Sequence, residues 1–159
     1  MNLLELMEKE AKAMGVNEKL FGRNLTLKGY DDSGKTAFNY AKDKSGVVYG
    51  YVIHLNEDEK QQLFEEAIRN KGCAINSLEE LKEVRDGYYP LYWGKSELIL
   101  GRLNAHLKGH KSNGNLHLCD YRFFLDKEIN YSVLMVTDNE RFEKSMINKY
   151  PPILKTYSN

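Results

Sequence analysis

The sequence contains no apolar run long enough to cross a membrane, and it begins without the pattern of a secretory signal. A membrane helix needs roughly 18 or more consecutive apolar residues, and no run among the 159 residues approaches that length. A secretory signal has basic residues before a continuous apolar run, whereas the segment MNLLELMEKEAKAMG has acidic residues early and an interrupted apolar stripe. We therefore expect a protein that does not enter the membrane and stays in the cytoplasm.

Cysteine is scarce and the net charge is zero. The two cysteines, Cys73 and Cys119, match neither a metal-ligand nor a redox spacing, so a reduced cytoplasmic location fits better than a disulfide scaffold. The 23 basic residues equal the 23 acidic ones. This balance argues against an overall positive surface that binds nucleic acid indiscriminately.

The charges are nevertheless unevenly distributed along the chain. Residues 55–86 contain nine acidic and five basic side chains, whereas residues 94–117 contain four basic side chains and Glu97 as the only acid. The second segment also contains His106, His110 and His117. A polyanion would therefore bind preferentially to residues 94–117.

The hydrophobic periodicity predicts one α+β domain over residues 1–159, since the chain is too short for two cores of ordinary size. Turn residues predict loop with short strands in the segment 22–46. Helices are predicted over 3–14, 56–70, from Ser77 onward, 98–108 and 139–149. Strands are predicted over 46–55, 88–96, 116–125 and 131–137.

Local signals support several of these elements. Ser77 and Glu80 have the spacing of a capping box, and Pro151 and Pro152 end the last helix. Pro90 predicts that its strand lies at an edge or just after a turn. In the strand 46–55 the alternation places two sets of side chains on opposite faces, namely Val47, Tyr49, Tyr51 and Ile53 against Val48, Val52 and His54.

Four segments occur in the order and spacing of the GIY-YIG nuclease family, and together they resemble it over about residues 46–155. They are Val47-Val48-Tyr49 as the first triad, Tyr92-Trp93-Gly94 as the second, Arg102 and His106 as the helix residues of the restriction-type branch, and Glu143 before a helix that ends in Tyr-Pro-Pro. The resemblance implies a small central antiparallel or mixed sheet flanked by helices. Residues 56–87 would be a helical insertion between the motif strands, and residues 1–45 an N-terminal helix and loop extension.

The chain departs from the family pattern in the length of that insertion and at Trp93, where a small aliphatic residue is usual. Loop closure becomes only slowly more costly with length, so a hairpin accepts an insertion. We expect Trp93 to point into the core and Tyr92 into the cleft.

The resemblance implies an endonuclease that hydrolyses double-stranded DNA with Mg²⁺ or Mn²⁺ held by Glu143. Tyr49 would take a proton from the attacking water or position it, and Tyr92 would orient water or phosphate. Arg102 and Lys95 would contact the phosphate, and His106 would polarise Tyr49 or hold the scissile phosphate. Lys108 and Lys111 would add DNA contacts, and DNA recognition would also use a homodimer.

Several alternatives remain open at this point. Tyr49 and Tyr92 could be ordinary strand tyrosines, and Tyr51 is a substitute for Tyr49 on the same strand face. Glu140 competes with Glu143 as the metal ligand. His106 and His110 could form half of a zinc site. The function could also be that of a nuclease fold that binds nucleic acid or protein without cutting, or of an RNA-cleaving toxin or effector.

Overall fold

The computed structural model describes residues 1–17, 22–28, 46–96, 106 and 116–156. These residues form an α+β fold, and its helices and strands are α1 (Leu3–Ala13), β1 (Gly22–Lys28), β2 (Val47–His54), α2 (Glu57–Arg69), β3 (Tyr88–Ser96), β4 (Glu128–Met135) and α4 (Asn139–Lys149). Three short 3₁₀ helices complete the described part, namely η2 (Leu78–Glu80), η3 (Leu118–Asp120) and η4 (Arg122–Asp126). The predicted helix over 98–108 lies outside the described residues, apart from His106.

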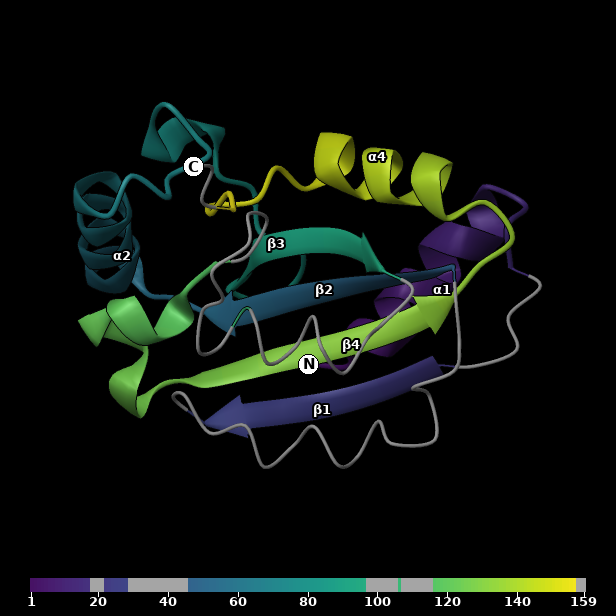
Figure 1. Cartoon of the computed structure of the whole chain (residues 1–159), viewed down its shortest axis with the longest axis horizontal. Helices are drawn as coiled ribbons and strands as arrows, with labels where there is room; N and C mark the ends of the chain where they lie inside the picture. The colour runs from purple at the N-terminus through teal and green to yellow at the C-terminus, as the bar shows by residue number, and fades with distance from the viewer. Residues whose placement is uncertain (18–21, 29–45, 97–105, 107–115, 157–159) are drawn as a thin grey trace.

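The four strands form one antiparallel sheet in the order β1-β4-β2-β3 (Figure 1). The strand that carries Tyr49 is therefore an inner strand, with β3 on one side and β4 on the other. Pro90 lies in the edge strand β3, as its lack of an N–H predicted. The register shifts between Tyr51 and Val52, so β3 has one extra residue at this point.

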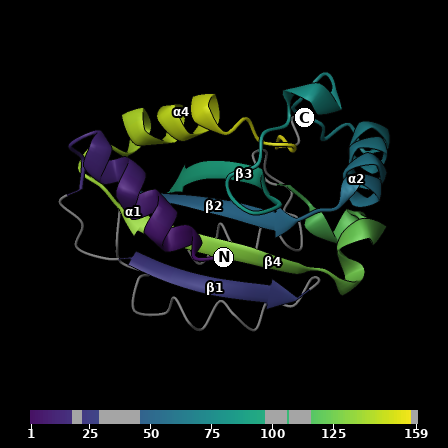
Figure 2. The same ribbon diagram turned by 180° about the vertical axis from the view of Figure 1, so that it is seen from behind.

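The two faces of the sheet support two separate cores, as the alternation in β2 predicted. Val48, Val52 and Trp93 pack with buried residues of α1 and α4 on one face. Figure 2 shows α1 crossing this face, while α4 lies along the β3 side. On the other face Val47, Tyr49, Tyr51 and Ile53 pack against α2, the 3₁₀ segments and the C-terminal segment. Trp93 is 1% exposed, which confirms its predicted direction.

The predicted helix boundaries follow from side-chain caps. Asn2 accepts a hydrogen bond from the Glu5 amide, and Asp138 accepts one from the Arg141 amide, at the starts of α1 and α4. Asn56 and Glu59 form a complete capping box at the start of α2. Each cap satisfies an amide that has no partner inside its helix.

The helix predicted from Ser77 is wrong, because only the three residues of η2 are helical. The Ser77 side chain makes no capping hydrogen bond, and the Glu80 carboxylate instead accepts from the Asn76 amide at 3.2 Å. Further along, the Val84 amide donates to the Tyr88 carbonyl at 2.8 Å. The turn into β3 therefore uses an amide that a longer helix would have needed.

The strand predicted over 116–125 is also wrong, because η3 and η4 occupy this segment. The amides of Arg122 and Phe123 donate to the Glu66 carboxylate of α2 rather than to a neighbouring strand, each at 3.1 Å. Leu118 and Phe124 are fully buried against the sheet. The apolar character of the segment therefore reflects burial in the core below the sheet and not membership of the sheet.

The predicted insertion 56–87 is built into this core. Leu63 and Ala67 of α2 are fully buried in the same cluster as Tyr49. The C-terminal segment joins the insertion to the sheet, because the Leu154 amide donates to the Leu91 carbonyl of β3 and the Lys155 amide donates to the Gly72 carbonyl. α2 therefore shares a core with the sheet.

We predict that Glu66→Ala lowers the free energy of unfolding by about 1–3 kcal/mol, because it leaves two amide donors of η4 without their acceptor. Chemical denaturation of both proteins measures this difference. Glu65→Ala is the matched control, since Glu65 is exposed and bonds only Gln61 of its own helix among the described contacts. Equal stability of the two variants would show that Glu66 does not hold η4.

No helix in the described ranges is both long and apolar enough to cross a membrane.

Candidate functional site

Four tyrosines and one histidine form a compact cluster on the α2 side of the sheet. Tyr49 and Tyr51 come from β2, Tyr92 from β3 and Tyr131 from β4, so three adjacent strands contribute. The His106 ring lies between 5.2 and 5.7 Å, centroid to centroid, from the rings of Tyr49, Tyr51 and Tyr92. The structure thus brings together three of the predicted site residues, Tyr49, Tyr92 and His106.

The Tyr49 hydroxyl and the His106 Nε2 atom are 2.7 Å apart, which is a short hydrogen-bond distance. The other ring nitrogen of His106, Nδ1, accepts a hydrogen bond from the backbone amide of Leu116 at 3.0 Å. His106 is 0% exposed and Tyr49 is 1% exposed. Both bonds are therefore shielded from competition with water, and they fix the orientation of the imidazole ring.

The two triads are joined by a reciprocal packing of aromatic rings on glycines. In the β2–β3 register Tyr49 faces Gly94 and Gly50 faces Trp93. A Cβ atom on Gly94 would lie 2.5 Å from the Tyr49 hydroxyl oxygen, and one on Gly50 would lie 2.3 Å from the Trp93 ring. Both glycines are thus required because an aromatic side chain of the partner strand lies directly over the backbone.

The Trp93 indole N–H also donates to the Tyr150 carbonyl at the end of α4, at 2.9 Å. This bond holds the helix that carries Glu143 against the sheet. It gives Trp93, which departs from the predicted second triad, a structural role.

We predict that Gly94→Ala displaces the Tyr49 ring and breaks its contact with His106, because the new methyl group would overlap the phenol. A loss of unfolding free energy of roughly 1–3 kcal/mol is expected from such overpacking. Gly50→Ala should cost a similar amount through Trp93 while leaving the Tyr49–His106 hydrogen bond in place. The histidine and tyrosine NMR signals of the two variants separate these effects, and an undisturbed Tyr49–His106 pair in Gly94→Ala would contradict the prediction.

Tyr92 is the member of the cluster that reaches the surface. Its side chain is partly exposed, whereas Tyr49, Tyr51 and Tyr131 are buried. The sequence predicted that Tyr92 points into a cleft. The structure places it at the rim of the cluster, as its one partly exposed tyrosine.

Glu143 lies one helical turn into α4 and is partly buried. Burial raises the pKa of the Glu143 carboxyl above its ordinary value, while the positive charge of Lys95 lowers it and the nearby Glu140 raises it further. Glu143 is therefore a partly desolvated carboxylate whose charge is partly compensated by the positive charge of Lys95. Glu140, in contrast, is 62% exposed and pairs with Lys144 at 3.4 Å.

The predicted residues fall into two groups on opposite sides of the sheet. Lys95 pairs with Val48, whose side chain packs in the core formed with α1 and α4, so Lys95 and Glu143 lie on that side. Tyr49, Tyr92 and His106 lie on the other side. The groups adjoin at the end of β3, where Gly94 under the Tyr49 ring is followed by Lys95.

Arg102, Lys108 and Lys111 lie outside the described residues, as does His110 of the zinc alternative. Among the described residues there is no group of three or more His, Cys, Asp or Glu side chains that could hold a metal ion. A metal site built on Glu143 would therefore use fewer than three such side chains from this part of the chain.

Two members of the site were not predicted from the sequence. Tyr131 lies opposite Tyr51 in the register, with ring centroids 4.5 Å apart. The Leu116 amide, which bonds His106, belongs to the backbone. Tyr131 lies in a segment with the alternation of a strand, but no sequence signal shows that β4 pairs with β2. The hydrogen bond from Leu116 could not be predicted because every residue except proline has the same backbone N–H.

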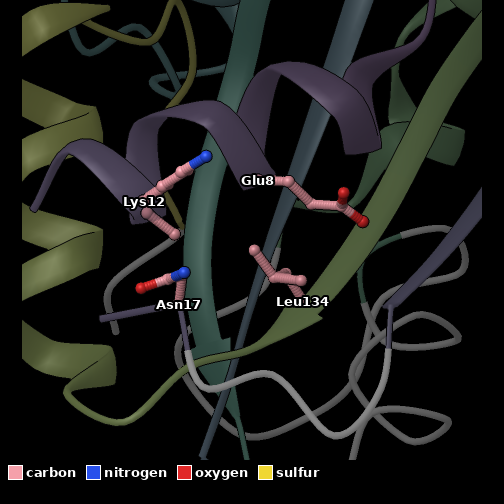
Figure 3. Close-up of a pocket in the computed structure, with 5 residues that line it drawn as sticks. Glu8, Lys12, Asn17 and Leu134 are labelled. Carbon is pink, nitrogen blue, oxygen red and sulfur yellow. The ribbon is translucent and has the colours of Figure 1, made fainter. Parts of the chain in front are cut away.

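Several hollows in the described surface are lined by none of the residues of the tyrosine cluster. A cavity of about 140 Å³ lies between α1 and β4, lined by Glu8, Ala11, Lys12, Asn17 and Leu134 (Figure 3). A hollow of about 370 Å³ is lined by Asp138, Glu140, Arg141 and Lys144 at the start of α4.

Comparison of the chain with protein-family models, with curated proteins and with solved structures found no match.

Proposed function

We propose that the chain is a divalent-metal-dependent DNA endonuclease of the GIY-YIG type, which hydrolyses phosphodiester bonds with Tyr49 as its central group. The observation that supports this most is the 2.7 Å contact between Tyr49 and His106. The motif pattern assigned both residues to one site although they are 57 positions apart. Tyr92 of the second triad lies in the same cluster.

The metal would be bound by Glu143. A carboxylate oxygen is the ligand that Mg²⁺ and Mn²⁺ prefer, and Mg²⁺ commonly keeps several waters with one or two protein carboxylates. The partial burial of Glu143 fits this role, because a bound cation would relieve the cost of the desolvated charge. When bound, the metal would supply stabilisation for negative charge that develops on the phosphate.

The remaining catalytic roles would be carried out by residues on both faces of the sheet at the end of β3. Tyr49 would accept a proton of the attacking water, and Tyr92 at the rim would orient the water or the phosphate. Lys95 would attract the phosphate from the Glu143 side. Arg102, which the motif assigns to the phosphate, would add a bidentate contact.

The direct test is cleavage of plasmid and genomic DNA by the purified chain with Mg²⁺ or Mn²⁺, with and without a chelator. We expect nicked or linear products that require the metal. Genomic DNA is included because a rare recognition sequence could be absent from a plasmid. The absence of cleavage on both substrates, over a range of salt and metal conditions, would contradict the proposed activity.

The burial of Tyr49 and His106 favours a second candidate, a nuclease fold that binds nucleic acid or protein without cutting. Their 1% and 0% exposures fit a structural pair in a core equally well. This candidate predicts metal-independent DNA binding, or none, with no cleavage. An RNA substrate is tested in the same assay by replacing the DNA with structured and single-stranded RNA.

A further inference from the structure

The two hydrogen bonds of His106 determine where its ring carries a proton. The Leu116 backbone N–H lies 3.0 Å from Nδ1, and an amide N–H can only donate. Nδ1 must therefore accept this bond and cannot carry a proton. A neutral imidazole has one protonated nitrogen, so the proton is on Nε2, the atom 2.7 Å from the Tyr49 hydroxyl oxygen.

We propose that the Leu116 amide holds His106 in the neutral Nε2–H tautomer and that His106 donates its hydrogen bond to the Tyr49 oxygen. His106 is then not the base that removes the phenol proton, because its one unprotonated nitrogen is already occupied by Leu116. A doubly protonated ring would have a proton on Nδ1, so that two N–H donors, His106 Nδ1–H and Leu116 N–H, would face each other. The complete burial of His106 also disfavours that charged form.

The packing around His106 keeps the ring in this orientation. The Tyr51 ring is nearly perpendicular to the imidazole, with an interplanar angle of 79°. The Tyr92 ring is tilted relative to the imidazole, and the two ring centroids are 5.2 Å apart. A ring flip would move carbon atoms to the positions of Nδ1 and Nε2 and lose both buried hydrogen bonds. His106 and the Leu116 amide are thus positioning groups for Tyr49.

This inference rests on the proposed function for its catalytic meaning. A donor at Nε2 stabilises Tyr49 as a phenolate, which forms by loss of its proton to solvent. The water oxygen then bonds to phosphorus while a water proton passes to the Tyr49 oxygen. The bond between phosphorus and the leaving sugar oxygen breaks, and that oxygen takes a proton from solvent.

The tautomer is measured on the 159-residue chain labelled with ¹⁵N-histidine, by long-range ¹H–¹⁵N NMR at neutral pH without DNA or metal. His106→Gln identifies the His106 signals among the four histidines. We expect a neutral ring protonated at Nε2, whose Nε2–H signal shifts in Tyr49→Phe. A proton on Nδ1, or a doubly protonated ring, would overturn the inference whether or not the protein cuts DNA.

Cleavage by two His106 variants tests the donor role. The amide of Gln in His106→Gln can donate near the former Nε2 position, whereas His106→Ala removes the donor. If His106 acts as a donor, His106→Gln should cut roughly tenfold or more faster than His106→Ala, as expected for one hydrogen bond to a charged group. Equal loss in both variants, in a wild type that cuts, would overturn the inference. A wild type that cuts nothing but has the Nε2–H ring overturns the proposed function and supports the tautomer.

Discussion

Glu143→Gln is expected to abolish metal-dependent cleavage while the protein folds at least as stably as the wild type. The amide keeps the shape of the side chain but removes the negative charge that would bind the metal. Loss of a catalytic metal should lower the rate by on the order of 10³-fold or more. DNA affinity without metal should change little, which a binding assay in the presence of a chelator measures.

The stability part of this prediction follows from the direction of the pKa shift. Burial raises the pKa of Glu143 in the folded protein above its value in the unfolded chain. The free energy of unfolding therefore falls as pH rises from the ordinary glutamate pKa, about 4.3, to the raised pKa of the folded protein. Glu143→Gln should therefore raise the melting temperature at neutral pH by on the order of 1 °C, with no gain at acidic pH where both proteins are uncharged at this position.

Glu140→Gln is the matched control, because Glu140 lies on the same helix but is exposed and paired with Lys144. It should cut at nearly the wild-type rate. If Glu140→Gln were inactive and Glu143→Gln cut normally, the metal ligand would be Glu140. If both variants cut normally, the proposed metal chemistry would be wrong for this protein.

Tyr49→Phe is expected to lower the cleavage rate by roughly 10²–10⁴-fold, the usual contribution of a general acid or base. Only the hydroxyl is removed, so the ring still covers Gly94 and packs against its neighbours. The change also removes the Tyr49 oxygen from its 2.7 Å hydrogen bond with buried His106, which should cost about 1–3 kcal/mol of unfolding free energy. Rates are therefore compared at a temperature where denaturation curves show both proteins folded.

Tyr51→Phe is the control from the same strand face. Tyr51 is as buried as Tyr49 and contacts the same imidazole, but its ring meets His106 edge-on and not through the 2.7 Å contact. It should keep most of the activity. Loss of activity in Tyr51→Phe with retention in Tyr49→Phe would move the central role to Tyr51.

The sequence by itself determined the elements whose signals are local. The helix α4 begins at its cap and ends before Pro151, as predicted over 139–149, and the alternation in β2 correctly divided Tyr49 from Val48. Capping and strand alternation involve residues within a few positions of one another, so the residue order records them directly. The α+β class followed from these elements, and it is confirmed.

In segments where a distant partner competes with a local preference, only the tertiary structure decided the conformation. Ser77 and Glu80 have capping-box spacing, yet the turn into β3 takes the amide of Val84, and the apolar segment after Leu116 gives two amides to Glu66 instead of joining the sheet. In the same way, the Leu116 amide that orients His106 and the Tyr131 ring beside Tyr51 come from segments distant in sequence. A backbone hydrogen bond formed across the fold does not depend on residue type, so these contacts were fixed by how the strands and helices pack and could not be read from the order of the residues.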